Sequence, residues 1–78
     1  MSERVTLYTR EGCHLCVDAR ATVARECEAA GVEWSEVDIT RDQGLTDIYG
    51  DEIPVVVVDG EVVGFWRINA DLLRLALS

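Results

Sequence analysis

The sequence predicts one α/β domain over residues 1–78, in which helices flank a four-stranded mixed sheet. Three observations predict it. A short strand-like segment leads at once into a long helical one, four consecutive valines mark a central strand, and an Asp-Gly pair directly after the valines indicates a hairpin. The expected order is β-α-β-α-β-β-α. A right-handed crossover makes the first two strands parallel, and the tail is an antiparallel hairpin followed by a helix.

The first strand is expected over residues 5–9, which favour extended structure, and Gly12 interrupts the chain after it. Residues 13–30 are rich in Ala, Arg and Glu and predict a helix that Gly31 ends. Apolar side chains recur in this helix at steps of three and four residues. They predict one buried face, made of Cys16, Ala19, Val23, Cys27 and Ala30.

Residues 32–39 alternate apolar and polar side chains and predict the second strand, with one irregularity near Ser35. Residues 45–49 predict a short helix that Gly50 ends. The most strand-like segment is 53–58, and its consecutive valines indicate a strand that is covered on both faces.

The C-terminal part begins with Asp59-Gly60, a pair typical of a two-residue hairpin turn with positive φ at both positions. Residues 61–66 form the expected return strand at the edge of the sheet. A last helix is expected to begin at Asn69 or Asp71. The side chains expected to pack inward from it are Leu72, Leu73, Leu75 and Ala76.

The charge of the chain restricts its partners. Fifteen acidic residues against seven arginines, with no lysine, give a net charge of −8. Such a chain repels phosphate, so nucleic acid and anionic membrane surfaces are not expected as partners. The charge favours solubility, or steering toward a basic patch on another protein. Residues 1–4 do not resemble a signal peptide, and the longest apolar stretch, 53–58, is too short to cross a bilayer. We therefore expect a soluble, cytoplasmic monomer.

The chemistry is expected at Cys13-His14-Leu15-Cys16, at the start of the first helix. Unpaired backbone N–H groups and the helix dipole stabilise an anion there, which favours the reactive thiolate of Cys13. Cys13 is therefore the predicted nucleophile, and Cys16, one turn further along, is the predicted resolving thiol. Exchange would pass through a mixed disulfide on Cys13.

Charged neighbours act on the thiolate in both directions. Arg10 and protonated His14 favour it, whereas Glu11 and Asp18 oppose it, and together with the backbone donors the balance favours a lowered pKa for Cys13.

Metal binding is the competing interpretation of the cysteine pair. A structural zinc site usually needs a second ligand pair, and none is evident in the sequence. Cys27 lies eleven residues after Cys16 on the same helix, too far to join it, and is expected to be a buried apolar residue. An iron–sulfur cluster shared between subunits also remains open. No metal or other cofactor is expected beyond a redox-active disulfide.

Several motifs together resemble the glutaredoxin-like branch of the thioredoxin superfamily: Tyr8-Thr9-Arg10-Glu11-Gly12-Cys13-His14-Leu15-Cys16, Ile53-Pro54-Val55, the valine strand and the Asp59-Gly60 turn. The resemblance covers nearly the whole chain and implies a thioredoxin-like fold with thiol-disulfide oxidoreductase activity. It also implies that Pro54 is cis and lies opposite the cysteines; the alternative is that Pro54 merely starts a strand, where proline is tolerated. The backbone of Ile53 would then pair with the substrate. The substrate-binding residues that we expect are Arg10, His14, Leu15, Ile53, Pro54, Gly64 and Phe65.

The resemblance leaves the electron donor open. Glutaredoxins usually carry basic or amide groups where this chain has Asp51 and Glu52, and a Gly-Gly pair where it has Gly64-Phe65. The Gly64-Phe65 step instead resembles small redoxins that reduce ribonucleotide reductase and receive electrons from thioredoxin reductase. The expected function is a dithiol reductase of protein disulfides that uses thioredoxin reductase or a low-molecular-weight thiol. The alternatives are a glutaredoxin dependent on glutathione or another such thiol, and an iron–sulfur-binding module.

Overall fold

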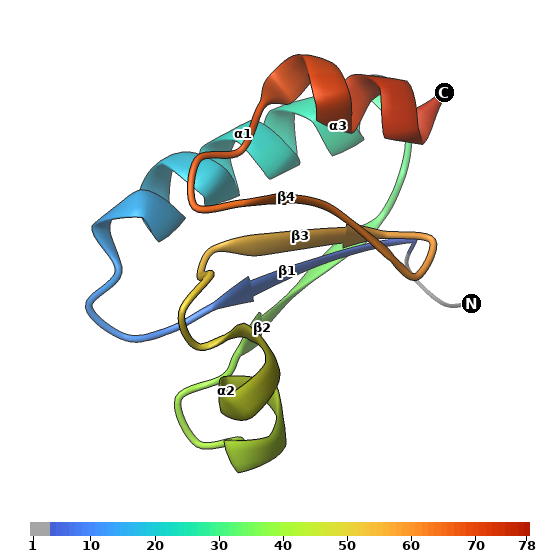
Figure 1. The fold of residues 1–78 in the computed structure, drawn as a ribbon. Coiled ribbons are helices and arrows are strands. Elements are labelled where there is room, and N and C mark those ends of the chain that lie inside the picture. The colour runs from blue at the N-terminus through green and yellow to red at the C-terminus, as the bar shows by residue number, and fades with distance from the viewer. Residues whose placement is uncertain (1–3) are drawn as a thin grey trace.

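The computed structural model describes residues 4–78. The prediction that residues 1–4 are not a signal peptide therefore lies mostly outside the described residues. The elements in chain order are β1 (Val5–Thr9), α1 (His14–Ala30), β2 (Trp34–Asp38), α2 (Gln43–Tyr49), β3 (Val55–Val58), β4 (Glu61–Phe65) and α3 (Ala70–Leu77). They form a four-stranded sheet in the order β2-β1-β3-β4, with β1 and β2 parallel and the other neighbours antiparallel (Figure 1). The predicted order of elements and the mixed sheet are confirmed.

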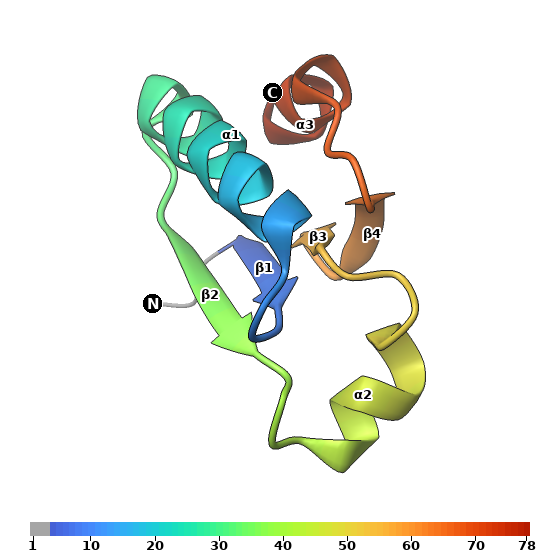
Figure 2. The same cartoon turned by 90° about the vertical axis from the view of Figure 1, so that its left-hand side faces the viewer.

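The helices lie on opposite sides of this sheet. Figure 2 shows α1 and α3 side by side above it and α2 below. Alternate strand residues build the main core with α1 and α3, among them Leu7 and Val56, which are paired across β1 and β3. On the other side the ring of Tyr49 in α2 stacks on Tyr8 of β1, with centroids 4.7 Å apart. The valine strand β3 therefore has packed side chains on both faces, as predicted.

The long helix α1 has a defined residue at each end. Cys13, expected as its first residue, instead occupies the N-cap with an extended backbone, and Gly31 ends the helix in the left-handed conformation with φ 68°. The predicted buried face is confirmed except at Ala30, which lines an open hollow between the ends of α1 and α3. Glu26 is buried nearby, because Arg74 of α3 hydrogen-bonds to both of its carboxylate oxygens. Within residues 4–78, no helix is long and apolar enough to cross a membrane.

The strands are shorter than the sequence predicts. β2 covers only 34–38, and β3 begins at Val55 instead of residue 53, because Ile53 lies outside the strand and the chain bends at Pro54. The hairpin turn is confirmed, with φ 51° at Asp59 and 86° at Gly60. β4 is an edge strand, as expected, and it ends one residue early because Trp66 takes the left-handed conformation with φ 60°.

The last helix begins as predicted but packs through a narrower stripe. The side chain of Asn69 caps α3 by accepting hydrogen bonds from the N–H groups of the second and third helical residues. The prediction that Leu72 and Leu75 pack inward is wrong, because 53% and 71% of their surfaces are exposed. Leu73 and Leu77, four residues apart and therefore on one face, make the buried contact instead.

Candidate active site

The turn between β1 and α1 presents two cysteines at the end of a helix. Gly12 supplies a left-handed residue, with φ 72°, that lets the chain reverse before Cys13. Cys13 and Cys16 are joined as a disulfide, with their Cα atoms 5.3 Å apart. The sulfur of Cys13 also accepts a hydrogen bond from the backbone N–H of Cys16 at 3.2 Å. Cys13 is thus the N-cap of α1 and Cys16 lies in its first turn, so the pair lies at the start of the helix, as the sequence predicted.

The two sulfur-bearing residues differ in accessibility. Cys16 is 2% exposed and belongs to a small apolar cluster with Ile39, Ile53 and Val55. Cys13 is half-buried and packs against the outside of that cluster. A partner molecule therefore reaches Cys13 more readily than Cys16.

The segment before β3 meets the cysteines at this cluster. The Ile53–Pro54 peptide bond is cis, as expected, and Ile53 is 6% exposed beside Cys16. Neither the N–H nor the C=O of Ile53 hydrogen-bonds to the backbone elsewhere in 4–78. A buried residue with unpaired main-chain groups is uncommon, since such groups are nearly always paired with protein or water. The structure thus leaves a main-chain donor and acceptor beside the disulfide.

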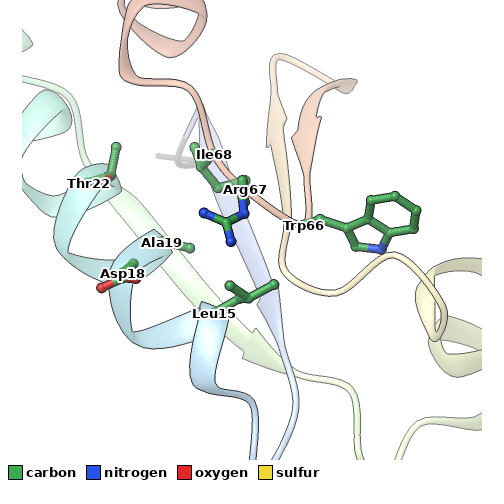
Figure 3. A pocket seen from close by; sticks show the side chains of 7 residues that line it. All are labelled: Leu15, Asp18, Ala19, Thr22, Trp66, Arg67 and Ile68. Atoms are coloured by element: carbon green, nitrogen blue, oxygen red, sulfur yellow. The ribbon is translucent and has the colours of Figure 1, made fainter.

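A hollow adjoins the cysteines between α1 and the loop that leads from β4 to α3. In Figure 3, Leu15 and Arg67 lie near each other across this hollow, whereas the indole of Trp66 is turned away from it. A second, more open hollow brings Leu15 together with Phe65, Trp66 and Arg67. The structure thus joins two predicted substrate-binding residues, Leu15 and Phe65, and adds Trp66 and Arg67, which had not been predicted as site residues.

The remaining predicted residues lie apart from that hollow. Arg10 lines a different one, which it shares with Glu11 and Asp51. His14 is exposed and lines none of these hollows. Gly64 is half-buried, and a Cβ on it would lie 3.5 Å from Ile68.

The structure also describes the third cysteine, an ion pair on the α1 side of the sheet, and the grouping of possible metal ligands. Cys27 lies in the main core, where burial raises the pKa of its thiol, so it is separate from the disulfide. On the α1 side of the sheet, the hydrogen bond from Arg20 lowers the pKa of Glu36, which also accepts a hydrogen bond from Thr9. Within the described part of the chain, no three His, Cys, Asp or Glu side chains gather as a metal-binding group.

Comparisons with known proteins agree with this geometry. Residues 4–78 match the family described as "Glutaredoxin-like domain (DUF836)". An uncharacterized protein of Mycobacterium tuberculosis is 32% identical over 80 residues, which cover 96% of this chain and 82% of that protein. The NMR structure of protein Ne2328 from Nitrosomonas europaea is 26% identical, with a TM-score of 0.82 over 100% of this chain and 94% of that one.

A further crystal structure bears on the fold. The thioredoxin-like protein BC3987 is 25% identical to this chain, with a TM-score of 0.66, and the match covers 92% of this chain and 97% of that one. The predicted thioredoxin-like architecture, a mixed sheet flanked by three helices, is therefore confirmed.

Proposed function

The chain belongs to the glutaredoxin-like domain family, and from this premise we propose that it is a dithiol oxidoreductase that reduces disulfides in proteins. The observation that carries the proposal is the cysteine pair at the N-cap of α1, with Cys13 accessible and Cys16 buried. A helix N-terminus stabilises the anionic sulfur that such chemistry needs.

The proposed reaction has two exchange steps. The thiolate of Cys13 attacks one sulfur of the substrate disulfide, so that a Cys13–substrate disulfide forms and the other substrate sulfur leaves as a thiolate, which takes up a proton. The thiolate of Cys16 then attacks the sulfur of Cys13 and releases the second substrate thiolate. The substrate gains two electrons and the chain is left with the Cys13–Cys16 disulfide, which an external thiol donor reduces.

In this proposal the surroundings of Cys13 receive the substrate. The unpaired main-chain groups of Ile53, held beside Pro54, would bond to the substrate backbone, and Leu15 and Phe65 offer apolar contact next to it. Arg10 contributes positive charge close to the attacking sulfur in sequence, and His14 is its direct neighbour in the chain. Gly64 would keep the end of β4 free of a side chain.

Trapping the intermediate tests this function. Reduced Cys16→Ser, mixed with a disulfide-bonded peptide, should accumulate a protein–peptide disulfide that mass spectrometry maps to Cys13. Cys13→Ser should accumulate none. Cys27→Ser is the matched control, since Cys27 is buried away from the pair, and it should turn over like the unmodified chain. Trapping on Cys27, or equal trapping by both pair variants, would overturn the assigned roles.

We further propose that thioredoxin reductase, or a low-molecular-weight thiol other than glutathione, supplies the electrons. The hollow beside Arg10 also contains Glu11 and Asp51, which oppose the binding of a glutathione carboxylate. Two like charges about 5 Å apart near a protein surface repel by roughly 1–3 kcal/mol, which is one to two decades in affinity. At the other end, where the family resemblance expects a small Gly-Gly pair, Gly64 is followed by the bulky Phe65 and Trp66.

Two coupled assays on one preparation test the donor. Turnover with thioredoxin reductase should exceed turnover with glutathione and glutathione reductase. Asp51→Asn should raise the glutathione-supported rate several-fold, whereas Asp47→Asn, which makes the same charge change on α2 outside the hollow, should not. A faster glutathione-supported rate that neither substitution changes would refute the electrostatic reasoning.

A further inference from the structure

Trp66 connects two loops beside the cysteines. Its backbone N–H donates to the carbonyl oxygens of Pro54 at 2.9 Å and Glu52 at 3.2 Å. Its indole Nε1–H donates to the carbonyl oxygen of Asp51 at 2.8 Å. One residue therefore hydrogen-bonds to the carbonyls of 51, 52 and 54, and in this loop only the carbonyl of Ile53 is left without such a bond.

The backbone of Trp66 is held in a conformation that its side chain disfavours. Its φ of 60° lies in the left-handed region, which bulky residues rarely adopt. Core burial does not account for this, because 53% of the residue is exposed and its ring meets Phe65 only edge-on, with centroids 5.2 Å apart. Figure 3 shows the indole turned away from α1. The three hydrogen bonds give the unfavourable backbone a physical reason.

Ile53 is thereby fixed from two directions. Its side chain packs in the cluster that contains Cys16, and its neighbours on both sides are bonded to Trp66. The carbonyls of 51, 52 and 54 already have a donor, so an incoming main chain finds its acceptor at Ile53.

We propose that Trp66 is a positioning residue, which holds the 51–54 loop so that the backbone of Ile53 is presented to the main chain of a substrate beside Cys13. This inference rests on the proposed function, since it concerns how the same site selects substrates. With Trp66 in this role, the site favours disulfides that are part of a peptide chain over small disulfides that have no peptide main chain. Trp66 acts through Ile53 and takes no part in the exchange of sulfur atoms.

The test compares two substrates and two tryptophans. Trp66→Phe removes the indole donor and keeps an aromatic ring and the backbone N–H. Trp34→Phe is the matched control, because Trp34 lies on β2 and its indole makes no hydrogen bond within 4–78. Reduced proteins are mixed in single-turnover experiments with a disulfide-bonded peptide or with bis(2-hydroxyethyl) disulfide, which has no main chain.

Trp66→Phe should lower the rate constant for the peptide about 5-fold, the equivalent of one neutral hydrogen bond of about 1 kcal/mol. The rate for the small disulfide, and both rates of Trp34→Phe, should change less than about twofold. The peptide amides that flank the cysteine are then N-methylated one at a time. At one of these amides, methylation should abolish the difference in peptide rate constant between wild type and Trp66→Phe. A merely structural role would not respond to that methyl group.

A second variant guards against a folding defect. Trp66→Gly accepts positive φ without strain and keeps the backbone donor, and it should show the same selective loss with the peptide. Equal losses on both substrates, or no loss on the peptide, would overturn the proposal. If wild type reduces neither substrate, the proposed function itself fails. If wild type reduces both and the ratio does not change in the variants, only the role of Trp66 fails.

Discussion

Replacing Leu73 by alanine removes a side chain that is 1% exposed, at the place where α3 packs against α1 and the sheet. Removing a buried leucine in this way costs about 2–5 kcal/mol, because apolar contact is lost and a cavity remains. A domain of this length has a free energy of unfolding of about 4–12 kcal/mol in total. Leu73→Ala should therefore remove a large part of the stability and lower the unfolding temperature by at least about 8 °C.

Leu75→Ala is the matched control, since it makes the same chemical change two positions along the same helix, on a residue that is 71% exposed. It should change the free energy of unfolding by no more than about 0.5 kcal/mol. Urea denaturation of both oxidised variants, followed by circular dichroism, measures the two changes. Equal denaturation midpoints would refute the packing described for α3. A larger loss of unfolding free energy from Leu75→Ala would mean that Leu75, and not Leu73, makes the buried contact.

Two further predictions concern titration and reactivity. The hydrogen bond from Arg74 holds the pKa of Glu26 below its ordinary value of 4.5, although desolvation acts in the opposite direction. A carboxylate with a depressed folded-state pKa stabilises the fold above its unfolded pKa, and this contribution disappears as the pH falls through the folded-state pKa. The unfolding temperature of Glu26→Gln should therefore fall less steeply than that of the unmodified chain between about pH 6 and pH 2. An unchanged slope would contradict this. Burial raises the pKa of Cys27, so in the folded, reduced chain iodoacetamide should label Cys13 first and Cys27 only after denaturation, as peptide mapping can show; early labelling of Cys27 would contradict its burial.

Local signals in the sequence predicted much of the fold. Gly31 at the end of α1 and Asp59-Gly60 at the hairpin were read correctly, because each depends on a backbone conformation that a few residue types favour. The Cys13–Cys16 pair was placed correctly at the start of α1 for a similar reason: its position follows from one strand, one glycine and one helix that are adjacent in sequence.

Features that depend on distant residues were not predictable in this way. Leu72 and Leu75 are as apolar as Leu73, and only the position of α3 against α1 decides which of them is buried. From the sequence alone, Glu26 would be taken for a surface residue of α1. Its burial depends on Arg74, which lies 48 residues later in the chain and hydrogen-bonds to it in the fold. The bonds of Trp66 to the 51–54 loop likewise join segments whose proximity the sequence pattern does not encode.

The sulfur of Cys13 belongs to two equilibria, since it caps α1 and is also one half of the Cys13–Cys16 disulfide. Reduction and unfolding of the chain therefore form a closed thermodynamic cycle. A substitution that stabilises α1 more in the reduced chain than in the oxidised one must make the disulfide easier to reduce by the same free energy, with about 1.4 kcal/mol corresponding to 30 mV. Helix caps contribute about 0.5–2 kcal/mol, so a difference in capping by Cys13 between the reduced and oxidised chains is large enough to shift the ease of reduction measurably.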